Sequence, residues 1–126
     1  MTHDSKKEQI LSQAFMKKYI AYAKKFVTPV LTDKAKKFIS TQWGDLRQKD
    51  YATSEKANQK VMPITVRSLE SLIRLATSHA KLRLSKEIEI EDCEIAIELM
   101  TYCLFGEDEV QKLKDKEYLF SKLKKY

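Results

Sequence analysis

Residues 63–85 read PITVRSLESLIRLATSHAKLRLS, and this stretch decides the fold. A proline followed closely by a threonine is typical of the start of a helix. Apolar side chains then recur every three or four residues, which places them on one helical face. They are Leu69, Leu72, Ile73, Ala76, Ala80 and Leu84. The stretch therefore predicts a helix of nearly twenty residues that packs this face against a core.

Two more helices are expected before this stretch. Apolar residues at helical spacing predict one over about 12–26, with Ser5 and Glu8 as a possible capping box and Pro29 as its end. Thr32 and Asp33 then favour a second helix. Its apolar face is Ala35, Phe38, Ile39, Trp43 and Leu46. Residues 49–62 show little periodicity and many small polar side chains, so they predict a long loop.

The stretch is followed by a second strongly apolar helix. Residues 87–90 alternate charge and isoleucine over too short a length for an independent strand. One face then carries Cys93, Ala96, Ile97, Met100 and Leu104, and Gly106 is a plausible C-cap. A second apolar side of Ile95, Leu99 and Tyr102 predicts a central helix sandwiched between others. Residues 107–126 are charged and predict an exposed helix or a partly disordered tail.

The composition of the chain excludes several classes of protein. The chain has 126 residues, with two Gly and two Pro, too few for a turn-rich β protein or a glycine-rich phosphate loop. No apolar run approaches the roughly 18 to 20 residues of a membrane span, and the first residues are charged, unlike a secretion signal. We therefore expect one all-α domain of three to five helices, with no membrane association and too small for a complete nucleotide-driven motor.

The charge is distributed unevenly. The chain carries a net charge of +6, but the first half is strongly basic, whereas residues 87–109 hold many acids and no base. This polarity favours docking against neighbouring proteins over a dedicated DNA binder. Cys93 and Cys103 are about 15 Å apart on one expected helix, beyond disulfide reach, so both are expected to be reduced core thiols. With His3 and His79 they show no metal-ligand spacing, and no metal site is expected.

No constellation of a free-standing catalyst is present. The sequence lacks a phosphate loop, a catalytic triad and an HExxH motif. Acids do gather at residues 91–98, but in the first turns of a helix they are better explained by the helix dipole than by acid–base catalysis.

Arg67 breaks a local rule. It lies in the first turn of the helix expected after Thr65, where free N–H groups and the helix dipole favour an anion. An arginine there makes sense if guanidinium and helix end bind the same negative ligand, such as a phosphate. The alternatives are an ion pair with Glu70 or plain solvation, and the residues alone favour these.

Three stretches carry a resemblance. They are AFMKKYIAYAKKFVTPVLTDKA at 14–35, PITVRSLESLIRLATSHAKLRLS at 63–85 and EIEIEDCEIAIELM at 87–100. Together they resemble the carboxyl-terminal lid of the minichromosome maintenance (MCM) family, the hexameric AAA+ replicative helicase. Within the family, KKEQILSQAFMKKYI, LRQKD at 46–50 and SLIRLATSHAKLRLSK are most similar to the subunit-three branch of the eukaryotic heterohexamer.

The resemblance implies a helical AAA+ lid subdomain of about four main helices and assigns roles to individual residues. The arginine of the family's P-[IV]-T-x-R segment is sensor 2, which acts in trans on the ATP of the adjacent subunit near its γ-phosphate; here it is Arg67. The YIAYAK segment lies near the adenine of the subunit's own nucleotide, so Tyr19 and Ile20 are weaker candidates for contacts in cis. For both, core packing is the favoured alternative. Arg74 could support the sensor 2 site or form a surface pair.

The resemblance also implies an organisation and a setting. Residues 1–11 would be a linker, residues 12–106 the lid with a pre-sensor 2 insertion around 33–62, and residues 107–126 a charged tail. Expected partners are the other MCM subunits, with ATP and Mg shared with a neighbour, DNA bound through the whole complex, and a nuclear location. The hydrolytic residues and the winged-helix domain are missing, so we expect a piece of a longer chain without activity alone. The alternative is an independent helical module that binds a protein or DNA.

Overall fold

The computed structural model describes residues 9–57 and 64–124. These two ranges contain five helices and two very short strands. They are α1 (Gln13–Phe26), β1 (Val30–Leu31), α2 (Asp33–Ala57), α3 (Val66–Leu82), β2 (Glu87–Ile88), α4 (Ile90–Phe105) and α5 (Glu107–Leu123). The expected all-α class is confirmed. No helix in these two ranges is long and apolar enough to cross a membrane.

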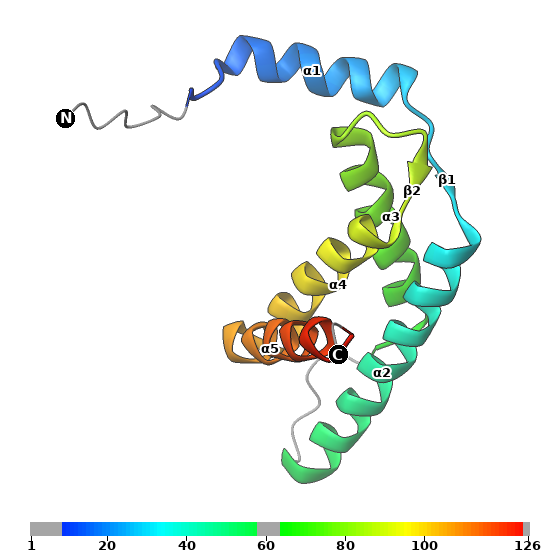
Figure 1. Cartoon of the computed structure of the whole chain (residues 1–126), viewed down its shortest axis with the longest axis vertical. Coiled ribbons are helices and arrows are strands. Elements are labelled where there is room, and N and C mark those ends of the chain that lie inside the picture. Colours follow the sequence, from blue (N-terminus) through cyan, green and yellow to red (C-terminus); the bar gives the residue numbers. More distant parts are fainter. Residues whose placement is uncertain (1–8, 58–63, 125–126) are drawn as a thin grey trace, which may run out of the picture.

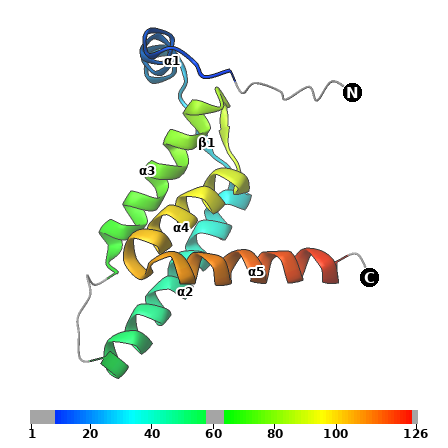
Figure 2. The same ribbon diagram turned by 90° about the vertical axis from the view of Figure 1, so that its left-hand side faces the viewer.

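Helices α2, α3 and α4 form the body of the molecule (Figure 1). The contacts between α3 and α4 are the most extensive of any two elements. Helix α1 lies across the C-terminal end of α3, and α5 extends away from the body beyond its contact with α4 (Figure 2). Strands β1 and β2 pair in parallel, with Val30 opposite Glu87 and Leu31 opposite Ile88. This pairing holds the start of α2 beside the start of α4.

The core lies where α2, α3 and α4 meet. Its buried side chains are Ala35, Ile39, Leu46, Ile64, Leu72, Ala76, Ala80, Ile88, Cys93, Ala96 and Ile97. Most belong to the helical faces that the sequence predicts, because burial of apolar surface selects those faces. Alanines at 35, 76, 80 and 96 are fully buried, which lets the helices approach each other closely.

Two predicted helix ends, at Thr32 and Gly106, are confirmed. Thr32 caps α2 by accepting a 3.2 Å hydrogen bond from the Ala35 N–H. Gly106 ends α4 with φ 87°, a conformation that favours glycine. Helix α1 is capped by Ser12, whose Oγ accepts from the Phe15 N–H at 3.2 Å. The capping box predicted from Ser5 and Glu8 lies outside the described residues.

The loop predicted over residues 49–62 is wrong for its first nine residues, because α2 continues to Ala57. The segment contains no proline or glycine to end a helix before that point. Its turns are also held by distant groups. Lys49 pairs with Glu109, and Asp50 accepts a hydrogen bond from the Ile64 N–H. Tertiary contacts thus stabilise a helix that local periodicity does not predict. Residues 58–62 lie outside the described ranges.

Three other expectations are corrected. Glu87–Ile88 does form a strand, because β1 supplies a partner that local sequence cannot reveal. Leu84 lies beyond α3, has φ 56° and is exposed, so it does not face the core. The second apolar side of α4 is not sandwiched: Ile95, Leu99 and Tyr102 are 36%, 49% and 57% exposed. Residues 107–123 form α5, whose Val110 is buried.

Candidate functional site

Arg67 is the second residue of α3 and is exposed. Among the described residues its guanidinium forms no ion pair, and the alternative pair with Glu70 is not seen. The first-turn N–H groups of a helix lack intrahelical partners and add to the positive end of its dipole. The start of α3 therefore presents a cation and a helix N-terminus in the same place, a combination suited to phosphate.

The start of α3 is held on α2. The Trp43 indole N–H donates to the Thr65 carbonyl at 3.4 Å, and the Ile64 N–H donates to an Asp50 carboxylate oxygen at 3.3 Å. The Thr65 N–H donates to Ser68 Oγ at 3.2 Å. Ile64 itself is buried in the core. The two residues that precede α3 are thus fixed by both backbone and side chain.

Arg74 lies two helical turns after Arg67 and is also exposed. Seven residues correspond to about 10 Å along the axis and to nearly two full turns, so both arginines share a face of α3. In the described residues the Arg74 guanidinium forms no ion pair either. Arg74 is thus a second exposed cation on the same face of α3 as Arg67.

Tyr19 and Ile20 lie at the other end of α3. The Tyr19 hydroxyl donates a hydrogen bond to the Leu82 carbonyl, and its ring lies 6.2 Å from that of Phe15. Ile20 is 39% exposed. Leu82 is fifteen residues from Arg67, which is about 22 Å along a helix. The structure therefore places Arg67 and Arg74 on one face of α3, about 10 Å apart along its axis, and keeps Tyr19 and Ile20 apart from both.

Tyr19→Phe tests the bond between α1 and α3. We expect it to lower the free energy of unfolding by about 0.5 to 1.5 kcal/mol, because the Leu82 carbonyl loses a partner while the ring remains. Urea unfolding of the two proteins measures this difference. Phe15→Leu is the control, since it removes the neighbouring ring and leaves the hydroxyl in place. Equal stability of Tyr19→Phe and wild type would contradict a structural role for this hydroxyl.

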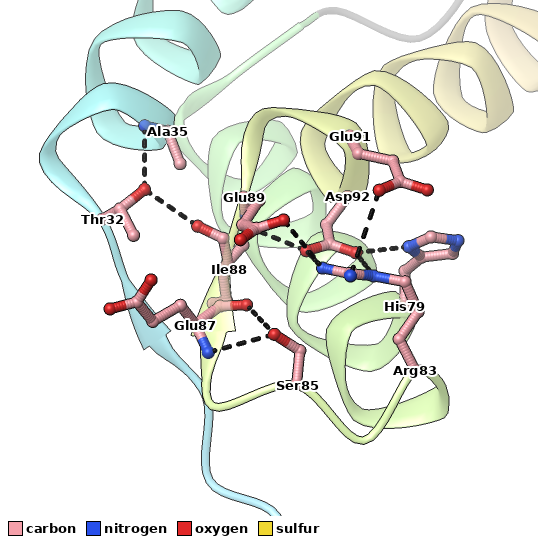
Figure 3. A network of polar contacts seen from close by, with 10 residues as sticks. All are labelled: Thr32, Ala35, His79, Arg83, Ser85, Glu87, Ile88, Glu89, Glu91 and Asp92. Carbon is pink, nitrogen blue, oxygen red and sulfur yellow. Dashed lines mark hydrogen bonds and ion pairs between the residues drawn. The ribbon is translucent and has the colours of Figure 1, made fainter.

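An ionic cluster centred on the buried Asp92 joins the end of α3 to the start of α4, and the local sequence pattern did not predict it (Figure 3). Asp92 is fully buried and accepts hydrogen bonds from Arg83 Nε at 2.9 Å and Arg83 Nη2 at 2.7 Å. It also accepts from the Glu89 N–H at 2.9 Å and contacts His79 Nδ1 at 2.5 Å. The available signal was the spacing of His79 and Arg83, four residues apart on one helical face.

The cluster shifts the pKa values of Asp92 and Arg83. Burial alone would raise the pKa of Asp92, but hydrogen bonds from Arg83, the Glu89 N–H and His79 outweigh it and hold this pKa at about 2. The same hydrogen bond with Asp92 raises the pKa of Arg83. Both groups remain charged over the physiological range. The cluster is therefore a permanent ionic clamp that fixes the first turn of α4 against the last turn of α3.

The remaining chemical groups support no other site. Glu94, beside Asp92 in the acidic run, has a raised pKa because of partial burial and the nearby Glu117 and Glu91. Within 9–57 and 64–124, no three acidic, histidine or cysteine side chains are placed to hold a metal ion. Cys93 is buried, as expected for a core thiol, but Cys103 is exposed because it lies on the outer side of α4.

Comparison with known sequences places the chain in context. Residues 14–104 match the family model of the MCM AAA-lid domain. The "Zygotic DNA replication licensing factor mcm3" of Xenopus tropicalis is 47% identical over 100 residues, which cover 79% of this chain. The "DNA replication licensing factor MCM3 homolog 1" of Zea mays is 38% identical over 113 residues, or 88% of the chain. These aligned regions are 12% and 14% of those relatives, so the chain corresponds to a small part of them.

A solved structure agrees with the sequence matches. The full-length MCM homologue from Methanopyrus kandleri superposes with a TM-score of 0.59 at 33% identity. The match covers 70% of this chain and 18% of the archaeal chain. The resemblance to the MCM lid and to its subunit-three branch is thus confirmed. By helical architecture, by the segment that carries Arg67 and by these matches, the chain belongs to the MCM AAA-lid domain family.

Proposed function

We propose that this chain acts as the lid of an MCM helicase subunit and supplies Arg67, as sensor 2, to the ATP of the neighbouring subunit. The observation that carries the proposal is a guanidinium without an ion pair among the described residues, in the first turn of α3. Arg67 would stabilise negative charge near the γ-phosphate and couple nucleotide state to the subunit interface. Arg74, two helical turns further along α3, would support binding of the same ligand.

The separation of the two candidate groups supports action on two different nucleotides. Tyr19 and Ile20, at the far end of α3, would lie near the adenine of the subunit's own ATP, although the Tyr19 hydroxyl already has a structural partner. Mg would accompany each ATP at an interface. The lid in this proposal is residues 12–106, with residues 33–62 as the insertion that displaces it. The partners are other MCM subunits in the nucleus, and DNA is bound by the whole complex.

An exposed apolar stripe on α4 supports the proposal that this chain packs, as a lid, against another domain. Ile95, Leu99 and Tyr102 lie at helical spacing and leave an apolar surface in the isolated chain. We propose that the subunit's own ATPase core covers it. An independent protein-binding or DNA-binding module is the rival, and the basic first half of the chain is its support.

Adding the chain to an MCM hexamer whose corresponding subunit lacks its lid tests this proposal. We expect wild type to restore assembly and ATP turnover, and Leu99→Asp to bind at least about tenfold more weakly, because it places a charge on the apolar stripe. Lys36→Asp, on the exposed side of α2, is the control. If no variant assembles while the chain alone binds duplex DNA with a steep salt dependence, the independent module is correct.

A further inference from the structure

Residues 43–50 of α2 contact three other elements: the start of α3, the end of α4 and the first turn of α5. The sequence attributes to this segment only apolar packing and the beginning of a loop. The hydrogen bonds of Trp43 and Asp50 instead go to the two residues that precede α3.

Trp43 and Asp50 form hydrogen bonds of opposite direction with the backbone just before α3. Trp43 Nε1 donates to the Thr65 carbonyl, and Asp50 accepts from the Ile64 N–H, so one donor and one acceptor of α2 bind adjacent residues. The Trp43 ring is in turn covered by the Arg47 guanidinium, 5.3 Å from the ring centroid. Ile64 and Leu46 pack in the same core. The start of α3 is therefore fixed in translation by two polar contacts and in rotation by a buried side chain.

Arg67 follows Thr65 by two residues, so its Cα moves with these anchors. A long side chain reaches its ligand from a position that the backbone sets, and a displacement of about 1 Å in a positioned group can cost as much as 100-fold in rate. We propose that Trp43 and Asp50 are positioning residues for Arg67, and that α2 thereby controls the alignment of the sensor arginine. This inference rests on the proposed function of Arg67.

The same segment links Arg67 to α5. Lys49, adjacent to Asp50, pairs with Glu109 in the first turn of α5 and lies 5.3 Å from the Phe105 ring centroid at the end of α4. Glu109 is held in its charged form, because its hydrogen bonds with Lys112 and Lys49 lower its pKa to about 2. Lys49 thus joins the turn of α2 that carries Asp50 to the first turn of α5.

The test uses a complete MCM subunit that contains this chain, assembled in its hexamer. Trp43→Phe keeps an aromatic ring, although a smaller one, and removes the donor. Asp50→Ala removes the acceptor, whereas Asp50→Asn keeps an oxygen. Asp45→Ala, an exposed acid on the same helix, is the matched control. We expect Trp43→Phe and Asp50→Ala each to lower kcat about 3- to 30-fold at that interface with little change in KM, and Asp50→Asn to recover most of the loss.

Two readouts separate positioning from a general structural effect. Amide exchange at residues 64–68 should become about tenfold faster in Asp50→Ala, while exchange at residues 76–80 stays unchanged. In an Arg67→Ala background, Asp50→Ala should cause no further loss of turnover, because both changes act through one group. An additive loss, or unchanged exchange at 64–68, overturns the inference. If Arg67→Ala alone leaves turnover unchanged, the proposed function fails, and the exchange data still report on the anchor.

Discussion

Arg67→Ala in a complete hexamer should lower ATP turnover at one interface by roughly 10- to 1,000-fold. The expected reason is the loss of a fixed positive charge at the point where negative charge develops on the transferred phosphate. Because no ion pair within the described residues engages the guanidinium, its removal should leave the fold intact. Arg67→Lys should lie between wild type and alanine, since lysine keeps the charge but lacks the planar fork that matches phosphate oxygens.

The measurement is single-interface turnover, with the other ATP sites of the hexamer silenced. Lys36→Ala is the control, because it removes one exposed positive charge from a different helix, α2. Thermal unfolding of the isolated chain should be the same for Arg67→Ala and wild type. Wild-type turnover by Arg67→Ala at that interface would contradict the assignment of this arginine as sensor 2.

Asp92→Ala should destabilise the fold. We expect it to lower the free energy of unfolding by about 1.5 to 3 kcal/mol, because the Arg83 guanidinium and the Glu89 N–H both lose a buried, charged acceptor. Asp92→Asn should lower the free energy of unfolding less, since one side-chain oxygen remains as an acceptor. Glu91→Ala is the control. Its carboxylate is 63% exposed and lies 4.0 Å from Arg83, so we expect a change within about 0.5 kcal/mol.

The pH dependence of stability gives the same cluster a second signature. The pKa of Asp92 is about 2 in the folded chain, below its ordinary value of 3.8. A lowered pKa stabilises the fold above the unfolded value, and that contribution is lost as the pH falls from about 4 through 2. Urea unfolding should therefore show wild type losing about 2 kcal/mol more than Asp92→Ala over this range. Parallel curves for the two proteins would contradict the clamp.

Helix ends and apolar faces could be predicted because they depend on neighbours in sequence. Thr32 and Gly106 act on backbone groups within their own turns, and the buried alanines of α3 follow from helical spacing. The same local reasoning singled out Arg67 as a cation in an unfavourable place. It failed where the deciding partner is distant. Strand β2 depends on β1, more than fifty residues earlier, and the turn of α2 at Lys49 and Asp50 is held by Glu109 and Ile64.

The acidic run at the start of α4 best separates what the sequence predicts from what only the tertiary structure decides. By sequence its members are equivalent acids beside a helix dipole, yet Asp92 is fully buried in an ionic clamp while Glu91 is mostly exposed. Only the crossing of α3 over α4 distinguishes them, because it brings Arg83 and His79 to one carboxylate. The sequence by itself determined the helical class and most of the faces that pack, and it singled out Arg67 as a candidate residue for binding phosphate. The tertiary structure alone decided which polar groups are paired, which apolar stripe stays open and what holds Arg67 in place, since these depend on contacts between segments far apart in the chain.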